Sequence, residues 1–141
     1  MKYLIFIFCA LLVGCASSLR TSPKYLSINN ELKIEIPSEC MLADENSKAM
    51  TCISNNNIFF MGIETGSDFQ ENILSSKYKK EVDDLYYGTF VKLNLGKNHM
   101  DFFHIKDSDI IIMGDDKKSI LNFSLDIYNK IRKTKSKSES E

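Results

Sequence analysis

Residues 91–113, VKLNLGKNHMDFFHIKDSDIIIM, carry the clearest strand-and-turn pattern in this chain of 141 residues. The first apolar residues of the stretch alternate with polar ones, as in a strand that buries one face. Gly96-Lys97-Asn98 and Asp107-Ser108 then interrupt the apolar pattern with residues that favour turns. The expected strands are 91–95, 100–105 and 109–113. Connections this short predict a three-stranded antiparallel meander.

Further strands are predicted before this meander. Leu32, Ile34 and Ile36 alternate with charged residues and end at Pro37, which indicates a half-buried strand. Other short apolar segments lie between polar residues that favour turns. These segments are 25–28, 41–42, 50–53 and 58–63. The second and third of them flank a polar stretch and fit a hairpin.

Two amphipathic helices are predicted as well. In the segment 68–86, apolar residues recur at spacings of three and four, and Ser67 with Gln70 fits a capping box. The apolar positions are Phe69, Ile73, Leu74, Tyr78, Val82, Leu85 and Tyr86. The second helix is expected at 119–131, after Asp115-Asp116, where two carboxylates suit the start of a helix.

This order of elements predicts a single α+β domain at residues 25–133. Short links between strands give an antiparallel sheet, and the two amphipathic helices need a sheet face to cover. The polar segment 134–141 is expected to be a disordered tail.

The N-terminus has the features of a secretory signal. Lys2 supplies a positive charge, residues 3–13 form an apolar centre, and Gly14 is a small residue of the kind found before a cleavage site. This apolar centre is shorter than the roughly 20 residues that a membrane-spanning helix needs.

Leu12-Val13-Gly14-Cys15 resembles the lipobox of bacterial lipoproteins. The resemblance implies that residues 1–14 are removed as a signal peptide and that the sulfur of Cys15 carries a lipid that anchors the chain to a membrane. In the alternative interpretation, an ordinary signal peptide is cut close to Ala16 and Cys15 is an incidental thiol.

The lipoprotein resemblance also implies a location in the cell envelope. In a bacterium with two membranes, Ala16 after the lipidated cysteine, in place of Asp, favours the outer membrane, facing the periplasm, over the inner membrane. In an organism with a single membrane, the same motif implies the outer face of the plasma membrane. The polar residues 15–24 are expected to form a flexible tether. The formal net charge of −1 argues against a nucleic-acid-binding protein, which would show a basic stripe.

The order of elements in the mature chain is similar to that of the PsbP-like family. The residues that carry this resemblance are Leu32-Lys33-Ile34-Glu35-Ile36-Pro37 and the final helix from Ser119 to Ile131. The tryptophan often found after that proline is absent. The resemblance implies an exported binding or adaptor module without a shared set of catalytic residues.

Cys40 and Cys52 are predicted to form a structural disulfide. They are equidistant from Asn46, the middle of the expected hairpin turn, and export places them in an oxidising compartment. The functional alternative is a redox pair, but that chemistry usually requires a Cys-X-X-Cys spacing.

We predict no catalytic, metal-binding or cofactor-binding residue. His99 and His104, the two histidines, are five positions apart and should point to opposite faces of a strand, which argues against a shared metal site. The adjacent carboxylates Asp83-Asp84 and Asp115-Asp116 are interpreted as helix caps or solvated surface rather than catalytic pairs.

Three aromatic pairs could form an exposed binding patch, although packing in the core is the alternative that we favour. The pairs are Phe59-Phe60, Tyr86-Tyr87 and Phe102-Phe103. The sequence therefore predicts a lipid-anchored binding or adaptor module that is not an enzyme and whose partner is another envelope protein. The alternatives are an immunity or inhibitor protein that neutralises a toxin or hydrolase, and a small envelope hydrolase.

Overall fold

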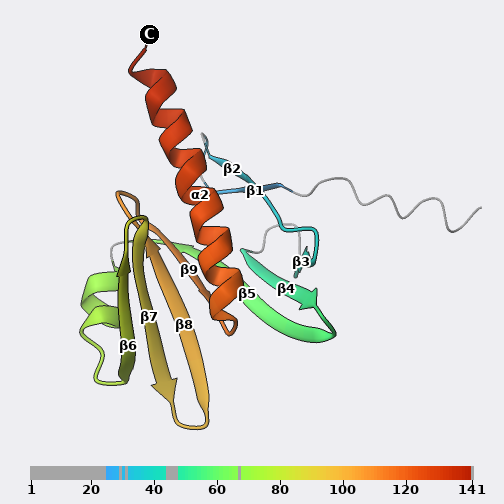
Figure 1. The fold of residues 1–141 in the computed structure, drawn as a ribbon, viewed down its shortest axis with the longest axis vertical. Helices are drawn as coiled ribbons and strands as arrows, with labels where there is room; N and C mark the ends of the chain where they lie inside the picture. The colour runs from blue at the N-terminus through green and yellow to red at the C-terminus, as the bar shows by residue number, and fades with distance from the viewer. Residues whose placement is uncertain (1–24, 29, 31, 44–47, 67, 141) are drawn as a thin grey trace, which may run out of the picture.

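The computed structural model describes residues 25–28, 30, 32–43, 48–66 and 68–140 (Figure 1). Its strands are β1 (Tyr25–Ser27), β2 (Lys33–Glu35), β3 (Cys40–Leu42), β4 (Ala49–Ser54), β5 (Asn57–Thr65), β6 (Lys79–Leu85), β7 (Gly88–Leu95), β8 (Asn98–Ile105) and β9 (Ile110–Gly114). The two helical elements are a short π-helical turn, η1 (Phe69–Leu74), and the long helix α2 (Lys117–Ser138).

Seven strands form one antiparallel sheet in the order β3-β4-β5-β9-β8-β7-β6. The strands β3–β5 and β6–β9 are two consecutive meanders. Pairing of β5 with β9 joins the two meanders into one open sheet. The segment with η1 connects β5 to the far edge strand β6. A separate two-stranded sheet pairs β1 with β2. The predicted antiparallel α+β domain is therefore confirmed, and its meander has one strand more than expected.

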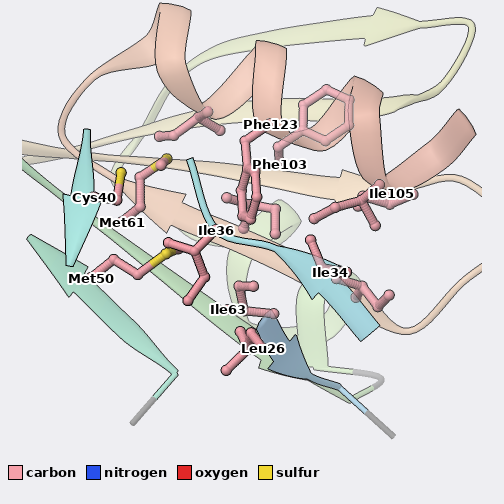
Figure 2. Close-up of a cluster of buried hydrophobic side chains, with 14 of the residues drawn as sticks. Leu26, Ile34, Ile36, Cys40, Met50, Met61, Ile63, Phe103, Ile105 and Phe123 are labelled. Atoms are coloured by element: carbon pink, nitrogen blue, oxygen red, sulfur yellow. The ribbon is translucent and has the colours of Figure 1, made fainter. Parts of the chain in front are cut away.

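The core lies on one face of this sheet, which we call the inner face. It is covered by α2 and by the β1–β2 hairpin (Figure 1). Figure 2 shows Leu26 and Ile34 of the hairpin directed toward Ile63 of β5, and Phe123 of α2 beside Phe103 of β8. We call the opposite side of the sheet the outer face.

The outer face has only a partial cover among the described residues. Phe69 of η1 packs there against Val91 and Ile111 in a second, smaller cluster. Leu93 is also buried in this cluster, and Ile73, Leu74 and Phe102 pack against it as partly buried side chains.

The helix predicted at 68–86 is wrong. Only Phe69–Leu74 is helical, and Lys79–Leu85 forms the edge strand β6, paired with β7. The apolar spacing resembled that of a helix, but Tyr78, Val82, Leu85 and Tyr86 are all exposed. They do not form the buried stripe of an amphipathic helix.

The C-terminal helix is confirmed and is longer than predicted. Asp116 is its N-cap, and its carboxylate accepts a hydrogen bond from the backbone N–H of Ser119 at 2.9 Å. The helix continues to Ser138, so most of the segment expected to be a disordered tail is helical. The helix carries two basic residues in its last turn, Lys135 and Lys137, which interact favourably with the helix dipole.

Several sequence predictions fall outside the described residues. These are the signal peptide at 1–14, the lipidated Cys15, the tether at 15–24 and Ser67 of the proposed capping box. They stay predictions.

Candidate functional site

Cys40 and Cys52 form the expected disulfide between β3 and β4. The two residues are directly paired across the antiparallel strands, and their Cα atoms are 4.0 Å apart. Cys52 is fully buried and Cys40 almost so. The disulfide therefore joins the edge strand β3 to the sheet from the core side, which is the position of a structural cross-link.

The two histidines lie on opposite faces of β8, as their spacing predicted. His99 faces the inner side and its Nε2 is 4.0 Å from a carboxylate oxygen of Asp101. The ring of His104 stacks on Phe69 of η1 on the outer side, with 4.9 Å between ring centroids. The described residues contain no group of three or more His, Cys, Asp or Glu side chains that could hold a metal ion.

His104 also lines a shallow groove, which is where a substrate would have to bind if this histidine were catalytic. The groove has a volume of about 460 Å³, and its lining includes Gln70, Asp107 and Asp109. Nε2 of His104 lies 2.8 Å from the backbone carbonyl oxygen of Ser108. Because a carbonyl oxygen can only accept, this nitrogen carries a proton and cannot act as a base. The hydroxyl of Ser108 donates to the carbonyl of Ile105, so it is not aligned with the imidazole as a nucleophile.

A charged cluster lies on the inner face where α2 begins. The ammonium group of Lys117 donates hydrogen bonds to Glu81 and to Asp83, the latter at 2.9 Å, and lies 4.3 Å from the centre of the Phe90 ring. These hydrogen bonds raise the pKa of Lys117 and lower that of Asp83. Lys92 on β7 is 3.9 Å from Glu81. The cluster thus ties the edge strand β6 to the start of the helix.

Asp101 is the buried member of this cluster. It is 1% exposed, and neither carboxylate oxygen has a hydrogen-bond partner. Burial raises the pKa of Asp101, while Lys92, His99 and Lys117 act in the opposite direction. We expected no special role for this residue, and a single Asp between Met100 and Phe102 in a strand gives no signal of its burial.

The adjacent carboxylates have structural partners. Asp84 accepts a hydrogen bond from the hydroxyl of Thr89 at 2.9 Å, and Asp115 accepts one from the backbone N–H of Phe60 at 2.7 Å. With Asp83 bound to Lys117 and Asp116 capping α2, all four side chains hold elements together. Only Asp116 is a cap, because Asp83 and Asp84 belong to a strand.

Each aromatic pair has one member buried in the core. Phe59, Tyr87 and Phe103 are buried in the core. Phe60 and Tyr86 are exposed, by 57% and 68%, and Phe102 is half-buried beside η1. Packing therefore explains one member of each pair and part of Phe102, and Phe60 and Tyr86 remain available at the surface.

An apolar surface that we call the outer patch covers β3, β4 and β5. It consists of Met41, Ile53, Ile58 and Phe60, whose exposed fractions are 57%, 53%, 65% and 57%. The strand register places these side chains together, because Met41 and Phe60 both flank Thr51, while Ile53 pairs with Ile58. The sequence showed apolar residues here but did not predict which of them would be exposed.

A tight turn supports the tip of the outer patch. Asn55 and Asn56 both adopt positive φ, 50° and 63°, in the two-residue turn between β4 and β5. Two such residues are typical of a type I′ turn, which asparagine tolerates well. The turn fixes the register in which Ile53 and Ile58 project side by side from the outer face.

Comparisons with protein-family models, curated proteins and solved structures found no match to this chain. The resemblances to bacterial lipoproteins and to the PsbP-like family therefore stay predictions from the sequence. Among the described residues, no helix is long and apolar enough to cross a membrane.

Proposed function

We propose that this chain is a lipid-anchored protein of the cell envelope that binds another envelope protein and is not an enzyme. The observation that carries the binding role is the outer patch. Four large apolar side chains are exposed on neighbouring strands, whereas single exposed apolar residues are ordinary on a protein surface.

The outer patch is not needed for the core of the domain. The inner face of the same strands already supplies the core with Met50, Phe59 and Met61. Exposed apolar surface is unfavourable in water by about 25 cal/mol per Å². A partner that covers Ile58 and Phe60 with apolar side chains of its own would remove that cost. We infer that the partner presents an apolar protein surface.

The edge strand β3 adds backbone hydrogen-bonding groups beside the patch. It pairs with β4 on one side and has no strand on its other side in the described sheet. An extended segment of a partner could add to such an edge by strand pairing. The combination of an open edge and Met41 at that edge supports a protein partner over a small ligand.

The arrangement of polar side chains supports a role without catalysis. Lys117, Asp84 and Asp115 are each bound to groups that hold the fold together, and Nε2 of His104 is bound to a backbone carbonyl. None of these contacts activates a nucleophile or positions a water molecule for attack.

The location rests on Leu12-Val13-Gly14-Cys15. A diacylglyceryl group on Cys15, with further acylation after cleavage, would hold the domain at the membrane, because each buried methylene adds roughly 0.8 kcal/mol. The sorting signal at Ala16 supports the outer membrane, facing the periplasm. Metabolic labelling with an alkyne fatty acid should mark the wild type and leave Cys15→Ala unmarked, and equal labelling of both would exclude lipid attachment at this residue.

The binding role is tested by a crosslinking pull-down from native membranes. We expect one envelope protein with the wild type and its loss with Ile58→Asp/Phe60→Asp. The matched control is Tyr78→Asp/Leu95→Asp, which places two charges at exposed apolar residues away from the patch. Retention of the partner by the patch variant would contradict the proposal.

A further inference from the structure

Positive charge is concentrated in α2. This helix of 22 residues contains seven basic residues and one acidic residue, a net charge of +6, although the whole chain has a net charge of −1. The rest of the chain is therefore acidic, at −7. The last nine residues of α2 hold five of the basic residues and no acidic one. They are Lys130, Arg132, Lys133, Lys135 and Lys137.

We call residues 130–138 the basic arm. The part of α2 that belongs to the core ends near Ile131, and every residue from Arg132 to Ser138 is exposed. In Figure 1 this end of the helix projects beyond the sheet. A polar extension of this kind adds little to packing, so its charge is free to act on something outside the domain.

Two tyrosines lie beside the base of the basic arm. The rings of Tyr86 and Tyr128 are 6.1 Å apart, and the guanidinium of Arg132 lies 5.9 Å from the centre of the Tyr128 ring. Tyr86 is 68% exposed although it belongs to this aromatic cluster. Amphipathic aromatic rings next to basic side chains are typical of the level of lipid headgroups.

A groove of about 250 Å³ continues this surface. Its lining includes Lys106, Arg132 and Lys135, together with the acidic residues Asp107 and Glu139. Nζ of Lys135 reaches the backbone carbonyl of Asp107 at 3.5 Å. Three cations thus line one hollow, two of them from the helix, beside two acidic residues.

We propose that the basic arm, with Tyr86 and Tyr128, lies on the anionic phospholipid surface of a membrane. Clusters of Lys and Arg bind such surfaces through their charge, and the attraction weakens as salt rises. The membrane is the one to which Cys15 would anchor the chain, so this proposal rests on the proposed function. Nine residues separate Cys15 from Tyr25, which reach at most about 30 Å when fully extended, and the β1–β2 hairpin that follows packs beside α2.

This placement sets the orientation of the outer patch. Phe60 is bound to Asp115, directly before the start of α2, through hydrogen bonds in both directions. The 22 residues of α2 span about 33 Å. With the basic arm on the bilayer, the patch lies at the other end of the helix, directed away from the lipid and accessible to a protein partner.

The test uses the mature chain, residues 15–141, with Cys15→Ala, so that neither the signal peptide nor an attached lipid contributes. Binding is measured by co-sedimentation with vesicles of phosphatidylcholine alone and of phosphatidylcholine with phosphatidylglycerol. The arm variant is Arg132→Gln/Lys133→Gln/Lys135→Gln/Lys137→Gln. The control variant, Lys33→Gln/Lys77→Gln/Lys97→Gln/Lys118→Gln, removes the same charge from exposed lysines elsewhere. Circular dichroism verifies that both variants are folded.

We expect preferential binding to the anionic vesicles, at least about tenfold weaker for the arm variant and within about twofold of the parent for the control variant. Because the chain contains no tryptophan, Tyr86→Trp supplies a single reporter, whose emission should shift to the blue with anionic vesicles only. Equal binding to both vesicle types, or equal losses in the two variants, would overturn the proposal. So would binding to a soluble polyanion as tight as to vesicles, without a blue shift. Each result is independent of lipidation and of the outer patch, so it is distinguishable from failure of the proposed function.

Discussion

Nζ of Lys117 lies 2.9 Å from Oδ2 of Asp83, so that the first residue of α2 is bound to the edge strand at the far side of the sheet. The two residues are 34 positions apart in the chain. The same ammonium group binds Glu81 and covers the ring of Phe90. This contact explains how β6 can present acidic side chains on the inner face of the sheet, where apolar residues would be expected.

Loss of this contact should loosen β6 rather than unfold the domain. In Lys117→Met the apolar stem remains over Phe90, but the charge that holds Glu81 and Asp83 is gone. We expect several-fold faster amide exchange in β6, with little change in the central strand β9. Hydrogen exchange followed by NMR measures this, and Lys118→Met, at the exposed neighbouring position, should leave both strands unchanged. Uniform acceleration in all strands would show that Lys117 acts on global stability instead.

Asp101 should make the stability of the domain depend on pH. Burial raises its pKa above the ordinary value of 3.8, so the folded chain keeps this proton to higher pH than the unfolded chain. The folded state therefore binds more protons just above pH 4, and the contribution of Asp101 to stability falls as pH rises. Asp101→Asn removes the ionisation.

We expect the free energy of unfolding of Asp101→Asn, relative to the wild type, to increase from pH 4 to pH 7. Urea denaturation at the two pH values measures it, and Asp126→Asn on the exposed side of α2 is the control for loss of one carboxylate. A relative stability that decreases over this interval would mean that the neighbouring cations Lys92, His99 and Lys117 dominate the burial of Asp101.

Two glycines test the pairing of β5 with β9. A Cβ atom on Gly114 would lie 2.2 Å from the backbone oxygen of Phe60, whereas one on Gly62 would lie 3.3 Å from the flexible side chain of Met113. Gly114→Ala should therefore destabilise the domain by about 2 kcal/mol or more, and Gly62→Ala by less than about 1 kcal/mol. Thermal denaturation of the two variants measures the difference. Equal effects would contradict the register of these strands.

The disulfide should contribute roughly 3 kcal/mol to the free energy of unfolding, as the chain-entropy model gives for a loop of this size. Reducing agent should lower the urea midpoint of the wild type to that of Cys40→Ser/Cys52→Ser, and should not affect the double variant. If reduction left the wild type unchanged, the thiols would not be linked in the folded protein.

The local pattern was sufficient for much of the fold. The alternation in 91–95 and the turn residues at 96–98 and 107–108 predicted β7, β8 and β9. Cys40 and Cys52 were recognisable as partners, since a hairpin with its centre at Asn46 pairs them directly. The helix expected at 119–131 lies within α2, and Ile120 and Ile127 of its apolar stripe are buried.

The strand β6 could not be predicted in the same way. Its sequence, Lys79–Leu85, is rich in charged residues, and the partner that accommodates Glu81 and Asp83 is Lys117 of a distant helix. The outer patch could not be predicted from the sequence either, because Phe59 and Phe60 differ only in the face of β5 on which they lie. Which face is covered depends on where α2 and η1 pack, and that is a property of the whole fold.

We propose that the outer patch contacts a protein in the envelope. The most direct measurement is photo-crosslinking in intact cells, with a photoreactive amino acid placed at Ile58 or at Lys97, which is exposed in the turn between β7 and β8. We expect one discrete adduct from position 58, abolished by Phe60→Asp, and none from position 97. The same adduct from both positions, or an adduct at position 58 that persists with Phe60→Asp, would contradict this proposal.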